Sequence, residues 1–212
     1  MKGNFIVFEG IDGSGTSTQA ELLKNFFLDQ NQGSHLTTEP SEGPIGNMIR
    51  QAFKGRLNLS KGKNPYLKDG DLFDEQMAYL FAADRHDHLY NQVDGVEKLL
   101  NTGASVISTR YFFSSYAYHC RSESDFQLVR SLNARFPNPD LVIYLNNPVK
   151  VSMERMKNRA FKDEYENEQK LSLVKKNYDT VFQNYEGKLV VIEATNTPVE
   201  IHNSIVDAVR DL

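Results

Sequence analysis

Short apolar runs recur along the chain at intervals that fit strands separated by helices. The runs FIVF at 5–8, LVIYL at 141–145 and LVVI at 189–192 are almost continuously apolar, without alternating polar residues. Such continuity is typical of strands that are covered on both faces. Weaker runs at His35–Thr38 and Val106–Ser108 bring the number of predicted strands to five.

The segments between these runs carry apolar residues at helical spacing. In Gln19–Leu28, for example, helical spacing puts four apolar residues on one face: Leu22, Leu23, Phe26 and Phe27. Further helices are expected at Phe73–Leu100, Val149–Lys157, Leu171–Tyr185 and Pro198–Val209. Strands that alternate with helices predict crossover connections. We therefore expect an α/β fold with a doubly wound, five-stranded parallel sheet flanked by helices.

Two polar stretches show neither the apolar runs of strands nor the apolar spacing of helices. Lys54–Asp71 is rich in Gly and Lys and is predicted to be a mobile surface loop. Asn158–Lys170 is densely charged, and two interpretations of it stay open. It is either part of a lid, taken as about residues 155–170, or a solvated helical connection.

Composition excludes some classes of protein. The chain has 212 residues, 40% hydrophobic and 25% charged, which excludes disordered and collagen-like chains and favours one domain over residues 1–212. Its net charge of −4 argues against broad binding of nucleic acid or an anionic membrane. Cys120 is the single cysteine, so no internal disulfide is expected. No apolar stretch reaches signal-peptide or transmembrane length, and we therefore expect a cytoplasmic protein.

The candidate chemistry begins directly after the first strand. Residues 10–18 read GIDGSGTST, which fits Gly-x-x-x-x-Gly-x-Ser, the spacing of a phosphate loop between a strand and a helix. Glycines let successive N–H groups turn toward an anion, and the helix N-terminus adds the positive end of its dipole. Ser17 stands where a hydroxyl could bind Mg²⁺. The alternative is a glycine-rich turn without a ligand, but the flanking strand and helix favour phosphate binding.

One position of this loop departs from the pattern. The residue before Ser17 is usually Lys, which places a cation on the terminal phosphates of the donor, whereas this chain has Thr16. Losing one preorganised contact at a reacting centre costs about 10²–10³ in rate. Backbone amides alone can still bind phosphates. The substitution therefore bears more on phosphoryl transfer than on nucleotide binding.

With its flanks, the loop strongly resembles that of thymidylate kinases, which are nucleoside-monophosphate kinases of the phosphate-loop class. Other motifs agree with this family in order and spacing over nearly the whole chain: EPSEGPIG at 39–46, LFAADR at 80–85, RY at 110–111 with SSYAY at 114–118, PDLVIYL at 139–145 and ERMKNR at 154–159. The resemblance implies ATP as donor with Mg²⁺, dTMP as acceptor, and a homodimer.

The resemblance also implies roles for individual residues. It implies ATP binding by Gly10, Ile11, Asp12, Gly13, Ser14, Gly15, Thr16, Ser17 and Thr18. It implies dTMP binding by Asp12, Glu39, Pro40, Arg50, Phe81, Arg85, Arg110, Ser114, Ser115 and Tyr118. It implies catalytic roles for Asp12, Arg110, Arg155 and Arg159.

Some of these positions have a physical interpretation of their own. Phe81 and Arg85 are four residues apart, so one helix face would present a ring that stacks on a base and a guanidinium that donates to a base carbonyl. Spacing alone favours a core Phe beside a surface Arg. Arg110 follows a strand, at the edge where parallel sheets bind ligands, although a surface salt bridge fits equally well. For Asp12 and Tyr118 the alternatives are a turn-forming acid and a packed ring.

Arg155, Arg159 and Lys162 form a basic cluster after the fourth strand, which is either a solvated helix face or a set of cations that reaches donor phosphates. We hypothesise that this cluster supplies the charge that is missing at Thr16. A second source is the first polar stretch, which holds Lys54, Arg56, Lys61 and Lys63.

Further departures from the family pattern are Thr38, Thr109 and His119, where the family has Arg, Asp and Gln. Three functions stay open: a dTMP kinase, a kinase of another deoxynucleoside monophosphate, and a catalytically weak or silent nucleotide-binding protein. The first is the leading hypothesis, and retention of Phe81, Arg85 and Arg110 argues against the third, because a silent protein need not keep a base pocket. The predicted partners are small nucleotides, without nucleic acid or membrane.

Overall fold

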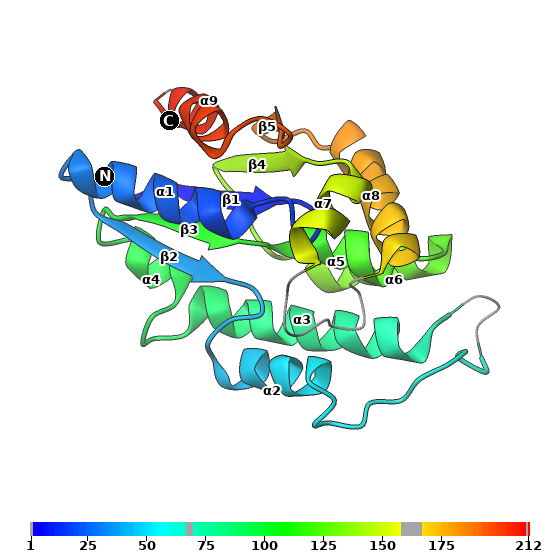
Figure 1. The fold of residues 1–212 in the computed structure, drawn as a ribbon. Helices are drawn as coiled ribbons and strands as arrows, with labels where there is room; N and C mark the ends of the chain where they lie inside the picture. The colour runs from blue at the N-terminus through cyan, green and yellow to red at the C-terminus, as the bar shows by residue number, and fades with distance from the viewer. Residues whose placement is uncertain (1, 67–69, 158–166, 211) are drawn as a thin grey trace.

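The computed structural model describes residues 2–66, 70–157, 167–210 and 212. Its centre is a five-stranded sheet in the order β2-β3-β1-β4-β5, and each pair of neighbours is parallel (Figure 1). The strands are β1 (Phe5–Glu9), β2 (Ser34–Thr38), β3 (Ser105–Thr109), β4 (Leu141–Asn146) and β5 (Leu189–Glu193). The predicted α/β class and the five predicted strands are confirmed.

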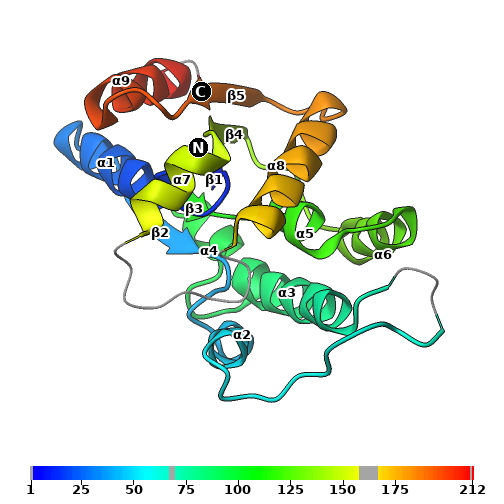
Figure 2. The ribbon, with the colours of Figure 1, turned by 45° about the vertical axis from the view of Figure 1, so that its right-hand side comes forward.

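Helices cover both faces of this sheet, which explains the continuous apolar runs. From β1, Ile6 and Phe8 pack in one core with α1 (Thr16–Asp29) and α9 (Pro198–Val209). Phe5 and Val7 point to the opposite core, built with α3 (Leu72–Tyr90), α5 (Phe112–His119) and α8 (Glu168–Gln183). Figure 2 shows the two layers on either side of the sheet.

The predicted helix over Phe73–Leu100 is wrong as one element. It divides into α3 and α4 (Val96–Leu100) at a turn made by Asn91. The Asn91 side-chain oxygen accepts from the backbone N–H groups of Val93 and Asp94, each at 2.9 Å. Asn side chains commonly replace helical hydrogen bonds in this way. The other predicted helices are confirmed within a few residues, including α7 (Val149–Met156).

Three helices were not expected from the hydrophobic pattern: α2 (Pro44–Phe53), α5 and α6 (Glu123–Asn133). Two of them begin with a local signal. Helix α2 starts with Pro44, and α6 starts with a capping box between Ser122 and Asp125. Seven of the eight residues of α5 are buried, so this helix has no polar face that would reveal its period.

The two polar stretches differ in how much of them is described. The first, from Lys54 to Asp71, is irregular except for one bridge between Lys63 and Asp71, and positions 67–69 lie outside the described residues. Of the proposed lid, positions 158–166, with Arg159 and Lys162, also lie outside them. No helix within the described ranges is long and apolar enough to cross a membrane.

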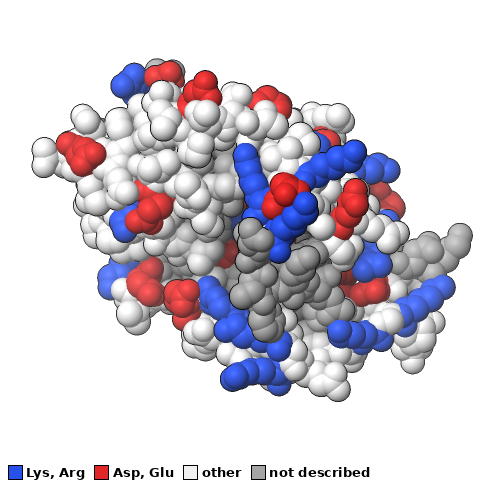
Figure 3. Space-filling view, in the orientation of Figure 1, with Lys and Arg blue, Asp and Glu red and all other residues white. Residues whose placement is uncertain are grey.

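Charged side chains of both signs are mixed on the surface. In the view of Figure 3, Lys and Arg gather over α7, near the centre, with acidic side chains among them. This helix packs against α8 and carries Arg155 in its last turn. The carboxyl ends of β1 and β3 meet beside it, and the candidate site lies there.

Candidate active site

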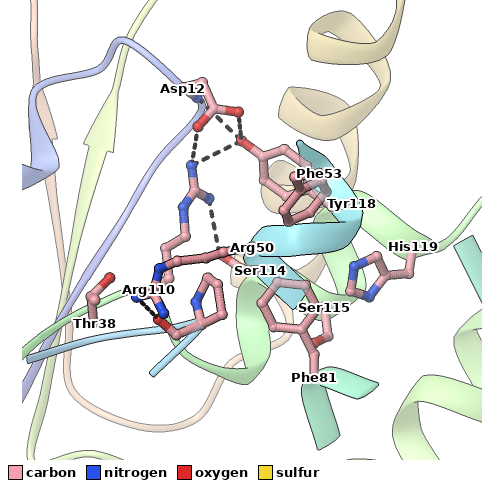
Figure 4. Close-up of a pocket in the computed structure, with 11 residues that line it drawn as sticks. Asp12, Thr38, Arg50, Phe53, Phe81, Arg110, Ser114, Ser115, Tyr118 and His119 are labelled. Carbon is pink, nitrogen blue, oxygen red and sulfur yellow. Dashed lines mark hydrogen bonds and ion pairs between the residues drawn. The ribbon is translucent and has the colours of Figure 1, made fainter. Parts of the chain in front are cut away.

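Two adjoining cavities open at the carboxyl edge of the sheet. The first, of about 400 Å³, is lined by Asp12, Thr38, Pro40, Arg50, Phe53, Phe81, Arg110, Ser114, Ser115, Tyr118 and His119 (Figure 4). The second, of about 390 Å³, is lined by Asp12, Gly13, Gly15, Thr16, Ser17, Thr18, Thr38, Thr109, Arg110 and Arg155. We call them the acceptor cavity and the donor cavity. They share Asp12, Thr38 and Arg110, so ligands in the two cavities would meet at these side chains.

The donor cavity is formed by the loop between β1 and α1. Gly13 and Gly15 have φ angles of +82° and +101°, which side-chain-bearing residues rarely adopt. A Cβ on Gly13 would also lie 2.7 Å from the carbonyl oxygen of Ser152. Gly15 is the N-cap of α1 and makes no side-chain hydrogen bond to the first backbone N–H groups of the helix, and the first residues of that helix, Thr16–Thr18, line the cavity. This geometry fits an anion cradle.

Arg155 is the lid-cluster residue that the structure brings to this cavity. Its guanidinium donates to the carbonyl oxygen of Ser14 in the loop at 3.3 Å and to that of Ala194, after β5, at 2.8 Å. It thus lies across the donor loop from α7 and lines the same cavity as Thr16. Lys54, Arg56, Lys61 and Lys63 of the first polar stretch do not line either described cavity.

Arg110 is held in a strained and densely bonded position. Its φ of +74° lies in the left-handed region, which is costly for a residue with a side chain. The guanidinium forms an ion pair with Asp12, donates to the Tyr118 hydroxyl at 3.2 Å and lies 4.8 Å from the centre of the Tyr118 ring (Figure 4). Burial lowers the pKa of Arg110, but Tyr118 and Asp12 beside it raise that pKa well above its usual range. Arg110 therefore stays charged.

The far wall of the acceptor cavity is aromatic. The ring of Phe81 lies 6.4 Å from that of Phe53 and 5.2 Å from that of His119, measured between ring centres. Burial lowers the pKa of His119 to about 3, so its imidazole is neutral. Flat rings in this arrangement fit a planar base. His119 was noted in the sequence only as a departure, and nothing in its spacing indicated a place in the cavity.

Arg85 is not among the described residues that line the acceptor cavity. It is fully buried, and its guanidinium forms an ion pair with Glu39, which is also buried, at 2.6 Å. It also donates to the Ser115 hydroxyl at 3.2 Å, and Ser115 does line the cavity. The structure therefore places Arg85 and Glu39 behind the wall. The predicted direct contact between Arg85 and a base stays a prediction.

Arg50 lines the acceptor cavity and also fixes the loop that follows β2. Its guanidinium donates to the carbonyl oxygen of Pro40 at 2.6 Å and to that of Ser41. The same loop is held from α3, because both the N–H and the hydroxyl of Ser41 donate to buried Asp84, at 2.7 and 2.6 Å. The cavity wall that includes Pro40 is thus tied to two helices.

Glu9 is a component of the site that sequence reasoning missed. It is fully buried at the end of β1 and accepts hydrogen bonds from Tyr111, Ser114 and Tyr178. Burial raises the pKa of Glu9 to about 7, against the opposing effect of Arg110. A single acid after an apolar run normally indicates only the end of a strand, so the sequence held no signal for it.

Comparisons with known proteins agree with this geometry. The family model described as Thymidylate kinase matches residues 8–205. A protein named "Probable thymidylate kinase" from Thermococcus onnurineus is 38% identical over 97% of this chain and 97% of the relative. Proteins with the same name from Thermococcus kodakarensis and Methanococcus aeolicus are 36% and 33% identical, each over 98% of this chain and 98% and 96% of the relative. The chain belongs to the thymidylate kinase family.

Proposed function

We propose that this protein transfers the γ-phosphoryl group of ATP to dTMP. The observation that carries the proposal is the junction of the two cavities at Arg110. A phosphate-binding loop lines one cavity and an aromatic wall lines the other, and the charged guanidinium lies on both. A donor phosphate and an acceptor phosphate that enter from the two sides would therefore meet beside one fixed cation.

On the acceptor side, we propose that Phe81 stacks on the thymine ring and that Arg110 contacts the acceptor phosphate. Tyr118, whose ring centre lies 4.8 Å from the Arg110 guanidinium and whose hydroxyl donates to Asp12 at 2.8 Å, would contact the sugar. Arg50, Pro40, Ser114 and Ser115 complete the wall. Arg85 and Glu39 support it from behind.

On the donor side, we propose that the ATP phosphates rest on the backbone of Gly10–Thr18. The Ser17 hydroxyl and the Asp12 carboxylate line the same cavity and supply oxygen atoms, which Mg²⁺ prefers. These residues fit a nucleotide-bound Mg²⁺, which would neutralise phosphate charge. We propose that Arg155, which donates to the Ser14 carbonyl oxygen of the loop, supplies part of the charge that Lys would bring at position 16.

Phosphoryl transfer requires positioning and charge neutralisation more than covalent chemistry from the protein. A phosphate oxygen of dTMP would attack the γ-phosphorus in line as the bond to the ADP leaving group breaks. Arg110 stays charged at that meeting point and would balance the negative charge of both phosphates. This division of labour does not need a nucleophilic side chain.

An assay of ADP release with a panel of nucleoside monophosphates tests the proposal. We expect kcat/KM for dTMP to exceed the values for dCMP, dGMP and dAMP, because the cavity wall of Phe53, Phe81 and neutral His119 suits an apolar, methyl-bearing pyrimidine. A comparable value for a purine monophosphate contradicts dTMP as the acceptor. Folded protein that binds neither ADP nor ATP at millimolar concentration contradicts the donor loop.

We further propose that the protein is a homodimer in the cytoplasm that acts on free nucleotides, without nucleic-acid or membrane partners. Support for the dimer comes from exposed apolar side chains on the paired helices α2 and α3: Met48, Tyr79 and Tyr90. Light scattering at micromolar concentration measures the mass directly. A particle of about 24 kDa contradicts the dimer.

A further inference from the structure

Glu9 joins several elements at the carboxyl edge of the sheet through its buried carboxylate. One oxygen accepts from the backbone N–H of Tyr111 at 2.8 Å. The other accepts from the hydroxyls of Ser114 and Tyr178, each at 2.7 Å. Tyr111 is the N-cap of α5, Ser114 lies in α5, and Tyr178 lies in α8. One side chain thus connects β1 to two helices that pack on the same face of the sheet.

All three contacts bear on Arg110. The N–H of Tyr111 belongs to the peptide group that follows Arg110, whose backbone is strained. The Ser114 hydroxyl that donates to Glu9 also accepts from Nη1 of Arg110 at 3.1 Å, and Tyr178 lies 3.5 Å from the same nitrogen. A strained residue persists only where its surroundings fix it.

We propose that Glu9 is a positioning residue, which fixes the strained backbone of Arg110 and, through the hydroxyls of Ser114 and Tyr178, the direction of its guanidinium. The inference deepens the proposed function and rests on it, because Arg110 lies at the junction of the two cavities. Glu9 lines neither cavity in the described part of the chain, so it acts through Arg110 and does not touch a substrate.

The variant Glu9→Gln tests this role, because it keeps the size of the side chain. It can present an NH₂ group to the hydroxyls of Ser114 and Tyr178, which now donate to a carboxylate, so these hydroxyls lose their acceptor and no longer hold the Arg110 guanidinium in one direction. A hydrogen bond to a charged group is worth about tenfold or more in binding. We expect the Kd for dTMP, measured by calorimetry at about pH 8, where Glu9 is ionised, to rise about tenfold. The Kd for ADP should change little, because the loop amides do not contact Glu9.

Two further variants separate positioning from folding. Tyr178→Phe removes one hydroxyl of the same network from outside the acceptor cavity and should raise the Kd for dTMP in the same direction. Glu193→Gln is the matched control, since Glu193 also ends a strand but is exposed and bonded only at the surface to Asn146. It should leave both dissociation constants unchanged.

A double-mutant cycle gives the decisive result. In an Arg110→Ala background, Glu9→Gln should cause no further loss of dTMP affinity, because no guanidinium is left to direct. Losses that multiply in the double variant, or an equal fall in affinity for ADP, would show a general structural role and overturn the proposal. So would an unchanged Kd for dTMP in the single variant.

Amide hydrogen exchange distinguishes failure of this inference from failure of the proposed function. Even if wild-type protein binds no dTMP, Glu9→Gln should speed exchange at Tyr111, whose N–H it now holds, while the amide of Val7 within β1 stays protected. Unchanged exchange at Tyr111 contradicts the positioning role by itself.

Discussion

The donor and acceptor cavities meet at Arg110 but are built in opposite ways. The donor cavity is lined largely by a loop of Gly, Ser and Thr, whose backbone is the binding surface. The acceptor cavity is lined by large side chains, with four aromatic rings among them. Buried polar groups stand behind its wall, such as the Arg85–Glu39 ion pair and the bonds from Ser41 to Asp84.

This difference explains how the chain can carry Thr16 where the pattern has Lys. A backbone cradle keeps its N–H groups whichever side chain stands at one position, so the substitution removes a cation and leaves the cradle. A cavity made of side chains depends on partners that hold each of them in place. We therefore expect changes on the donor side to lower the rate, and changes behind the acceptor wall to lower stability and affinity together.

The largest effect is expected from Arg85→Ala. Removing the guanidinium leaves the Glu39 carboxylate buried without its ion-pair partner, and breaking a buried pair costs about 3–5 kcal/mol. Unfolding in urea should show a loss of this size in the free energy of unfolding. A direct base contact would instead weaken dTMP binding and leave the stability of the free protein nearly unchanged.

The double variant Arg85→Met with Glu39→Gln is the matched control for that prediction. It removes both charges and keeps most of the buried volume, so it should recover a large part of the lost stability. If it is no more stable than Arg85→Ala, the ion pair is not what holds this wall.

On the donor side, Arg155→Ala should lower kcat by about 10²-fold while the Kd for ADP changes little. The guanidinium lies across the loop and would act on phosphate charge as it moves, whereas the amides provide the affinity. Adding Thr16→Lys to this variant should restore part of the rate in the same coupled assay.

Lys157→Ala serves as the control, because this exposed residue lies two positions further along the same helix end. It should leave kcat unchanged. If Arg155→Ala also leaves kcat unchanged, and Thr16→Lys alone raises turnover by orders of magnitude, then Arg155 does not replace the missing Lys. The same experiment on Arg159 would then test the residue that lies outside the described part of the chain.

The sequence revealed the parts of the molecule whose signals are local. Continuous apolar runs gave the five strands, and glycine spacing after the first of them gave the phosphate loop. Arg110 was expected at the carboxyl edge because it follows a strand, and it lies there. These inferences need only neighbouring residues and the rule that parallel strands bind ligands at that edge.

The parts that could not be predicted depend on contacts between distant residues. Glu9 became part of the site only because donors at positions 111, 114 and 178, far away in the sequence, converge on its carboxylate. Helical spacing correctly put Phe81 and Arg85 on one helix. Around these two residues, however, α3 is buried on more than one side. Spacing therefore could not decide whether Arg85 enters the cavity or supports it.

A smaller effect is expected from Phe81→Leu. The substitution keeps an apolar wall but removes the flat face for stacking, which is worth about 1 kcal/mol beyond burial. We expect kcat/KM for dTMP to fall about five- to tenfold with little change in the Kd for ADP. Phe126→Leu, on α6 and outside both cavities, is the control and should leave kcat/KM unchanged. A fall in ADP affinity equal to that for dTMP would contradict separate construction of the two cavities.

The most delicate prediction concerns pH, because two buried groups of the acceptor side titrate in opposite senses. Burial raises the pKa of Glu9 to about 7, so between pH 4.5 and 7 the folded protein holds a proton that the unfolded chain has lost. The contribution of Glu9 to stability therefore falls as pH rises through this range. Burial lowers the pKa of His119 to about 3, so its contribution rises with pH between about 3 and 6.5.

In the overlap between about pH 4.5 and 6.5 the two slopes oppose each other. Glu9 faces Arg110, Ser114 and Tyr178, and His119 lies near Asp74 and Lys170, so each group has its own charged surroundings. Glu9→Gln should leave the His119 slope uncompensated, and the free energy of unfolding should rise more steeply with pH than in wild type, by roughly 1 kcal/mol per pH unit. His119→Gln should shift the slope the other way. Urea unfolding at pH 5, 5.5 and 6 measures both, and equal slopes in the two variants would show that neither group titrates as its burial implies.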